Sequence, residues 1–295
     1  MLRKEILADF GLLLAALSWG LNFVITKDAL ASVSPFTYAS MRFLLAAVIM
    51  VIIFPKKLKQ ITREDLKAGC IVGLFLFTSF TAQTLGLIYT TPGKSGFISS
   101  IYVVIVPFMY IFISKELPGF WSILSAFLAL IGLALLSLGD NLTVNSGDFL
   151  TLICAFLFAG HIISIGIFAS KSDPVILNII QFTVVAILST LIMLINDGTE
   201  FKTLSTSVWK AILYGVLVCT IGAYGLQTAA QKYTSSSRTA LILSLESVFA
   251  VMFSYFFWGE ELTLRMIIGC ILIFVGIILT EIKPGFLKTK TGEYS

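Results

Sequence analysis

The chain has 295 residues, of which 58% are hydrophobic and only 12% are charged, and its mean hydropathy is +0.99. A soluble domain keeps about 25% of its residues charged to cover its surface, so this composition excludes a soluble globular protein. The net charge of +4 is spread over short loops, so we expect a lipid bilayer and no nucleic acid around the chain.

Long runs without formal charge predict an all-α integral membrane protein with about ten transmembrane helices. A bilayer core of roughly 30 Å needs about 20 apolar residues per helix, whereas strands of a membrane barrel would alternate apolar and polar residues. In chain order, the predicted spans are Phe10–Thr26, Pro35–Pro55, Ala68–Gly93, Ser95–Ser114, Leu117–Gly139, Phe149–Ser170, Pro174–Asn196, Ala211–Gln231, Thr239–Gly259 and Met266–Thr280.

The basic residues predict the orientation of these spans. When the N-terminus is placed in the cytoplasm, the inner loops receive most of the Lys and Arg residues, including Lys56, Lys57 and Lys59. We therefore expect a multi-pass protein of the cell (inner) membrane with both termini in the cytoplasm. Arg3 and Lys4 precede the first apolar run as in a signal peptide, but that run is long, so we expect an uncleaved first helix.

The chain also repeats itself. An offset of 144 residues pairs Gln83 with Gln227, Thr90 with Thr234, Lys94 with Arg238 and Ser100 with Ser244, and an offset of 139 pairs Pro35 with Pro174 and Phe43 with Phe182. We predict a first five-helix repeat at 1–140, a second at 141–282 and a cytoplasmic tail at 283–295. Because five is odd, the second repeat enters the membrane from the opposite side, and the two repeats are inverted.

Several segments resemble the EamA-type drug/metabolite transporters of the ten-helix kind. They are Ser18–Phe23 (SWGLNF), Leu245–Ala250 (LESVFA) and the glutamate-containing turns Lys115–Leu117 and Gly259–Leu262. The resemblance implies a central cavity walled by the first, third, fourth, sixth, eighth and ninth helices, with the fifth and tenth outside it. Members mostly export amino acids and other metabolites, and some import. They often carry proline after the ninth-helix glutamate, where this chain has Ser247, so we expect a different local bend.

Glu246 is the acidic residue that lies well inside a predicted span. A buried charge is expensive, so such a group usually faces a cavity or a partner. Its repeat counterpart is Tyr102, which would share one helix face with Ser95 and Ser99. Glu246 is therefore a candidate for substrate binding and proton coupling; the alternative is a structural carboxylate bonded to a neighbouring helix. Histidine can titrate near neutral pH, so His161 is the second candidate for proton coupling, or else a packing residue.

Amide and aromatic side chains complete the candidate site, because amides can orient a polar solute while rings cover its apolar part. The predicted substrate-binding residues are Trp19, Asn22, Phe80, Gln83, Ser99, Tyr102, His161, Tyr224, Gln227 and Glu246.

Arg42 is the basic residue placed away from both ends of a predicted span. A protein carboxylate or a substrate carboxylate would stabilise it, which makes it a candidate charge partner. Two alternatives remain: its side chain extends to the outer interface, or it forms a hydrogen-bonded contact between helices, as its uncharged counterpart Gln181 would.

These observations favour a secondary transporter of a small polar metabolite, such as an amino acid, that exports it by alternating access. The alternative is an importer of a cationic metabolite such as choline, held by Glu246 and aromatic rings. A membrane sensor or assembly subunit is the non-transport alternative. No zinc-protease or phosphate-loop motif is present and the four cysteines stand alone, so we expect no enzyme, metal or cofactor. The sequence assigns no oligomeric state.

Overall fold

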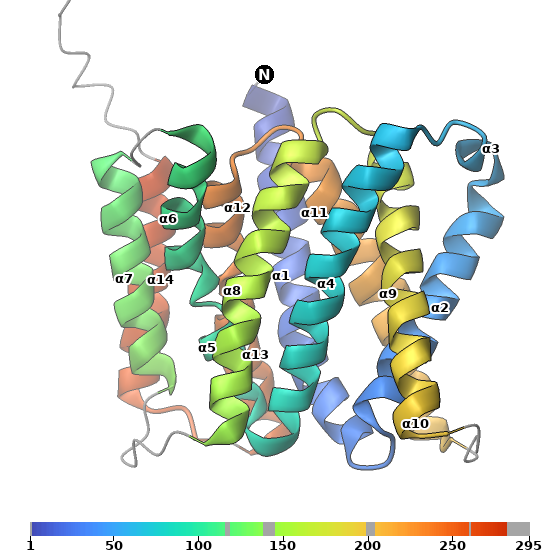
Figure 1. Cartoon of the computed structure of the whole chain (residues 1–295). Helices are drawn as coiled ribbons and strands as arrows, with labels where there is room; N and C mark the ends of the chain where they lie inside the picture. The colour runs from blue at the N-terminus through green and yellow to red at the C-terminus, as the bar shows by residue number, and fades with distance from the viewer. Residues whose placement is uncertain (1, 116–118, 138–144, 199–203, 260, 282–295) are drawn as a thin grey trace, which may run out of the picture.

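The structure is a computed structural model, and it describes residues 2–115, 119–137, 145–198, 204–259 and 261–281. These residues form a bundle of helices that run between two faces (Figure 1). The first half contains α1 (Leu2–Leu30), α2 (Pro35–Ile53), α3 (Pro55–Leu58), α4 (Arg63–Tyr89), α5 (Pro92–Ser99), α6 (Tyr102–Ser114) and α7 (Phe120–Ser137). The second half contains α8 (Ser146–Phe168), α9 (Pro174–Asn196), α10 (Thr206–Tyr214), the π-helix η1 (Gly215–Tyr224), α11 (Gly225–Ala230), α12 (Ser236–Leu243), α13 (Leu245–Trp258) and α14 (Leu264–Glu281).

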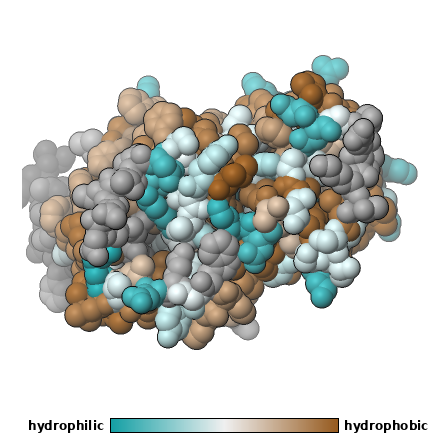
Figure 2. Space-filling view, turned by 90° about the horizontal axis from the view of Figure 1, so that it is seen from below, coloured by the Kyte–Doolittle hydropathy of each residue, from teal (hydrophilic) through white to brown (hydrophobic). Residues whose placement is uncertain are grey.

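The predicted all-α membrane fold is confirmed. Eight helical stretches in the described residues are long and apolar enough to cross a bilayer, and α7 and α14 contain two shorter apolar helices. We call the face at which α1 begins the N-terminal face, and the other the opposite face. Figure 2 shows the opposite face: polar residues gather across its middle, while apolar residues form much of its edge. Exposed apolar side chains such as Ile52, Ile187 and Phe256 fit the lipid-facing surface of such a bundle.

Local sequence explains where several spans begin. Proline is favoured at the first helical position, and α2 and α9 begin at Pro35 and Pro174 after the capping residues Ser34 and Asp173. The Asn145 side chain accepts a hydrogen bond from the backbone N–H of Asp148, and the Asp148 carboxylate accepts one from the backbone N–H of Asn145, which starts α8.

The two halves are inverted with respect to each other. α1 begins at the N-terminal face, whereas α8 begins at the opposite face (Figure 1). The corresponding helices α2 and α9 pack together at one end of the bundle, and α7 and α14 pack together at the other. The predicted boundaries of the repeats at 140/141 and 282/283, the tail, and Glu116 and Glu260 of the two glutamate turns lie outside the described residues.

Two predicted spans are not continuous helices. The fourth breaks after Ser99 and the ninth breaks at Ser244, and near both breaks backbone N–H groups bond the carbonyl three residues back instead of four. The break falls between Ser99 and Tyr102, so the single helix face expected for Ser95, Ser99 and Tyr102 is interrupted. The eighth span carries the π-helix η1, whereas its repeat counterpart α4 is a continuous α-helix.

Two of the segments that resemble the transporter family, Ser18–Phe23 and Leu245–Ala250, pack directly on each other. A Cβ atom added to Gly20 of α1 would lie 2.4 Å from the Phe249 Cβ and 3.0 Å from the Glu246 carbonyl oxygen of α13. Only glycine allows this close approach of the two backbones. The contact holds α1 against the first turn of α13, next to Trp19 and Glu246.

Candidate functional site

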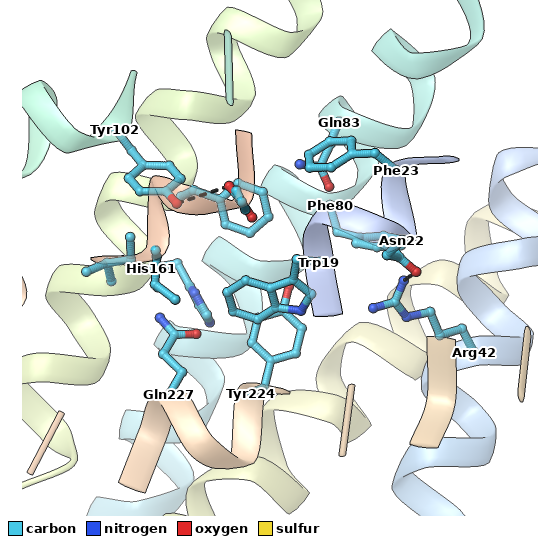
Figure 3. Close-up of a pocket in the computed structure, with 14 residues that line it drawn as sticks. Trp19, Asn22, Phe23, Arg42, Phe80, Gln83, Tyr102, His161, Tyr224 and Gln227 are labelled. Carbon is cyan, nitrogen blue, oxygen red and sulfur yellow. Dashed lines mark hydrogen bonds between the residues drawn. The ribbon is translucent and has the colours of Figure 1, made fainter. Parts of the chain in front are cut away.

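A small cavity of about 40 Å³ lies inside the bundle, between the two halves (Figure 3). This volume would hold only a few water molecules and is well below the range of about 300–1,000 Å³ that is usual for small-molecule sites, so the cavity must widen to admit a solute. Its lining residues are Trp19, Asn22, Phe23, Arg42, Phe80, Gln83, Tyr102, Phe158, His161, Ile162, Tyr224, Gln227, Leu243 and Glu246. They come from the first, third, fourth, sixth, eighth and ninth spans, as the family resemblance implied, and also from α2 through Arg42.

Every predicted binding residue except Ser99 lines the cavity. Ser99 is buried behind it: its hydroxyl accepts a hydrogen bond from Gln83 Nε2 at 3.2 Å and donates one to the Ser95 carbonyl at 2.7 Å. Ser99 therefore positions the Gln83 amide and does not line the cavity.

Four lining residues escaped the sequence reasoning: Phe23, Phe158, Ile162 and Leu243. The offset of 139 that pairs Asn22 with His161 also pairs Trp19 with Phe158 and Phe23 with Ile162. When the offset is applied to the whole first-helix segment, it predicts Phe158 and Ile162 as lining residues. The cavity wall is thus built largely from repeat-related pairs, which places it on the pseudo-twofold axis between the halves.

Glu246 is 5% exposed and hydrogen-bonded to its own repeat counterpart. The Tyr102 hydroxyl donates to Glu246 Oε1 at 3.0 Å, as the dashed line in Figure 3 marks, and the Ser100 hydroxyl lies 3.5 Å from the same oxygen. Glu246 also lies in the first turn of α13, where the backbone N–H groups favour a negative charge. No ion pair involves this carboxylate among the described residues.

Arg42 is 1% exposed, so the expectation that it extends to the interface is wrong. Its Nε donates to Thr220 Oγ1 at 2.8 Å, its Nη1 lies 3.4 Å from Asn22 Oδ1, and its guanidinium lies 4.9 Å from the centre of the Phe80 ring. A protein carboxylate partner is likewise not found in the described part of the chain. The hydrogen-bonded contact between helices is the arrangement observed, and it leaves a positive charge beside the cavity.

Gln227 directs an acceptor atom to the cavity. Gln231 Nε2 donates to the Ile162 carbonyl at 2.8 Å, so the Oε1 atom of Gln231 faces Gln227. This atom accepts a hydrogen bond from Gln227 Nε2 at 3.1 Å. Gln227 Oε1 is buried and has no hydrogen-bond partner within the described residues. Because a buried acceptor is costly to leave unpaired, a ligand donor is its natural partner.

His161 is held by the second half of the chain. Its Nε2 lies 3.0 Å from Gln181 Oε1, and Gln181 Nε2 donates to Asn178 Oδ1. The amide oxygen of Gln181 therefore faces the ring, which assigns the proton of neutral His161 to Nε2. None of the described hydrogen bonds joins His161 to Glu246, so a proton relay between them stays a prediction.

Aromatic rings form the apolar part of the wall. The Trp19 and Tyr224 rings lie 4.8 Å apart between centroids, and the Trp19 Nε1–H donates to the Cys219 carbonyl at 3.1 Å. This bond satisfies the indole N–H and leaves its ring to pack on Tyr224 at the cavity.

Residues 6–138 and 145–282 both match the profile of the EamA-like transporter family. The chain belongs to this family. An uncharacterized transporter of Archaeoglobus fulgidus is 35% identical to this EamA-like protein over 95% of this chain and 87% of its own length. A protein of Salmonella typhimurium described as a probable amino-acid metabolite efflux pump is 26% identical over the whole of both chains.

A protein of Escherichia coli with the same description is 24% identical over 90% of this chain and 92% of its own. A solved crystal structure shares the fold of the EamA-like chain, with a TM-score of 0.74 and 16% identity over 92% of this chain and 96% of that one. The predicted resemblance is therefore confirmed: the chain is an EamA-like transporter, and the cavity lies between its two matched halves.

Proposed function

We propose that this EamA-like transporter is a secondary transporter that exports a small zwitterionic metabolite, with an amino acid as the simplest case. The observation that carries the proposal is a pair of ionisable groups of opposite sign, one acidic and one basic, at one cavity. Glu246 and Arg42 both line it, and neither belongs to a described ion pair. A ligand with an ammonium and a carboxylate group would compensate both charges at once.

The rest of the wall suits such a ligand. Gln227 Oε1 is an acceptor for an ammonium N–H, and Asn22 lies beside Arg42 (Figure 3). The rings of Trp19 and Tyr224 would cover the apolar part of the ligand. Polar groups that orient the solute and rings that cover it are the usual composition of a small-molecule site.

The outward direction is supported by relatives. The similar proteins of Salmonella typhimurium and Escherichia coli are described as probable amino-acid metabolite efflux pumps. The orientation comes from charge: the N-terminal face carries α3 with Lys56 and Lys57 and the turn with Lys171, and we place this face in the cytoplasm.

The test is substrate counterflow in proteoliposomes with a labelled panel of amino acids and amines, with and without a pH gradient. The variant is Glu246→Gln, and the matched control is Glu64→Gln, which makes the same change at an exposed residue of α4. We expect uptake of an amino acid by the wild type and by the control, and none by Glu246→Gln. Dependence on the gradient would assign proton coupling to the same carboxylate.

Unchanged uptake by Glu246→Gln would reduce Glu246 to a structural carboxylate and reject its role in transport. A wild type that moves quaternary amines but no amino acid would favour the choline-type importer, in which the Trp19 and Tyr224 rings hold the cation. Uptake of nothing on the panel would reject the proposal and return the sensor or assembly subunit to consideration.

A further inference from the structure

Each face of the bundle holds an ion pair, and the two ion pairs are related by the repeat. On the opposite face, Lys94 Nζ lies 2.6 Å from Asp148 Oδ2, and on the N-terminal face Arg238 Nη2 bonds Asp9 Oδ2. The offset of 139 relates Asp9 to Asp148, and the offset of 144 relates Lys94 to Arg238. One interaction is therefore built twice, once at each end of the molecule.

Each ion pair joins two spans that wall the cavity. Asp9 lies ten residues before Trp19 on α1, which is about 15 Å along the helix at 1.5 Å per residue. Arg238 lies eight residues before Glu246, across the break between α12 and α13. The repeat gives the same arrangement to α8 and the α5–α6 span on the opposite face. Separating the partners of one pair would thus release two walls of the cavity at one face.

The two copies of this ion pair differ in their hydrogen bonding and in the exposure of the aspartate. On the opposite face, the Thr90 hydroxyl donates to Asp148 Oδ1 at 2.9 Å, and the Asp148 side chain is 4% exposed. The counterpart of Thr90 is Thr234, whose buried Oγ1 has no hydrogen-bond partner among the described residues, and neither has Asp9 Oδ1. The Asp9 side chain is also 23% exposed. The same bond is made on one face and missing on the other.

We propose that these two clusters are the gates of the transport cycle, each completed only when its own face is closed. The opposite-face lock is Thr90, Lys94 and Asp148, and the N-terminal lock is Thr234, Arg238 and Asp9. The proposal rests on the proposed transport function, because alternating access in an inverted repeat exchanges the conformations of the two halves. In the exchanged state the Thr234 hydroxyl donates to Asp9 Oδ1, while the bond from Thr90 to Asp148 is broken.

A purely structural role would make each ion pair a fixed neutraliser of charge near the end of a span. Such a role gives no reason for the threonine–aspartate bond to be present in one copy and absent in the other. A gate does, because alternating access requires the two faces to be closed unequally.

The experiment reads out accessibility of the cavity, not transport. The reporter is Phe158→Cys in the full chain, with the four native cysteines replaced by alanine, labelled with a membrane-impermeant maleimide from each face in vesicles of the two orientations. We expect Asp148→Asn to raise the labelling rate from the opposite face and lower it from the N-terminal face. Asp9→Asn has the reverse effect. Each variant shifts the ratio of the two rates by roughly tenfold or more, as expected for losing a charge-assisted hydrogen bond.

Two milder variants and one control accompany the aspartate changes. Thr90→Val and Thr234→Val remove only the hydroxyl and shift the ratio in the directions of Asp148→Asn and Asp9→Asn, respectively. Lys57→Ala breaks the ion pair of Lys57 with Asp173 on the N-terminal face, which joins α3 to the start of α9, and leaves the ratio unchanged.

Equal changes from both faces, or no change with the aspartate and threonine variants, would overturn the gates. Reciprocal labelling without counterflow of any solute would reject the transport proposal but keep the locks. Counterflow without reciprocal labelling would reject the locks but keep the transport proposal, so the two failures are distinguishable.

Discussion

Arg42 offers a test that separates function from stability. Its side chain is the largest fully buried one among the described residues, and no described carboxylate forms an ion pair with it. If its charge is kept for a substrate carboxylate, Arg42→Gln abolishes transport while the fold survives. Glutamine is the residue that the repeat has at the equivalent position, Gln181, so an amide is compatible with this place in the helix pair.

The expected change in stability follows from the contacts. Arg42→Gln loses the charged hydrogen bond to Thr220 (2.8 Å), a loss of about 1.5–3 kcal/mol. It also loses the cation–π contact with Phe80 (4.9 Å), which contributes about 1–2 kcal/mol. Against these stands the relief of several kcal/mol for not burying a charge without a counter-ion. The terms oppose each other, so we expect the free energy of unfolding to change by less than about 2 kcal/mol.

The assay pairs thermal unfolding in detergent with counterflow of an amino acid and of the amine that lacks its carboxylate. We expect Arg42→Gln to keep a nearly unchanged midpoint, to lose uptake of the amino acid and to retain more uptake of the amine. Arg42→Lys keeps the charge but not the planar fork, so it should fall between the two. Wild-type uptake of the amino acid by Arg42→Gln would refute the reasoning, and so would a large loss of stability.

Two further predictions concern the scaffold. Gly20→Ala places a Cβ 2.4 Å from the Phe249 Cβ, so we expect about 1–3 kcal/mol of destabilisation and a lower unfolding midpoint in detergent; an unchanged midpoint would contradict the close packing. Asp173 caps α9 and pairs with Lys57: burial by itself raises the pKa of Asp173, but the Lys57 ammonium and the Val175 and Ile176 N–H groups outweigh burial and lower it. Its stabilisation is therefore present above about pH 4 and is lost as pH falls through the lowered pKa, so the midpoint difference between wild type and Asp173→Asn should shrink in acid. A difference that stays constant down to pH of about 3 would contradict this sign.

Much of the fold could be predicted from the sequence because lipid permits few solutions. Uncharged runs of sufficient length must become helices, and α9 was predicted at its observed bounds, Pro174–Asn196. The repeat offsets pair Glu246 with Tyr102 and Gln83 with Gln227, and all four side chains line the cavity. A constant offset in residue number predicts equivalent positions in space because the two related halves fold alike.

The helix breaks after Ser99 and at Ser244 were not predictable from composition, since neither site has a proline or glycine to mark it. On one side of the first break, Ser99 lies behind the cavity wall and bonds Gln83; on the other side, Tyr102 lines the cavity and bonds Glu246. The π-helix η1 likewise has no counterpart in α4, so the repeat itself gave no warning.

The sequence by itself determined the membrane class, the two inverted halves and the family, because apolar length and repeat register are properties of the chain alone. Only the tertiary structure decided what each polar group touches. Arg42 donates to Thr220 and its guanidinium lies over the Phe80 ring, and no described ion pair joins it to a carboxylate. Repeat-related residues have equivalent places in the sequence, but their contacts depend on how two non-identical halves pack against each other, and that packing is set by groups distant in the chain.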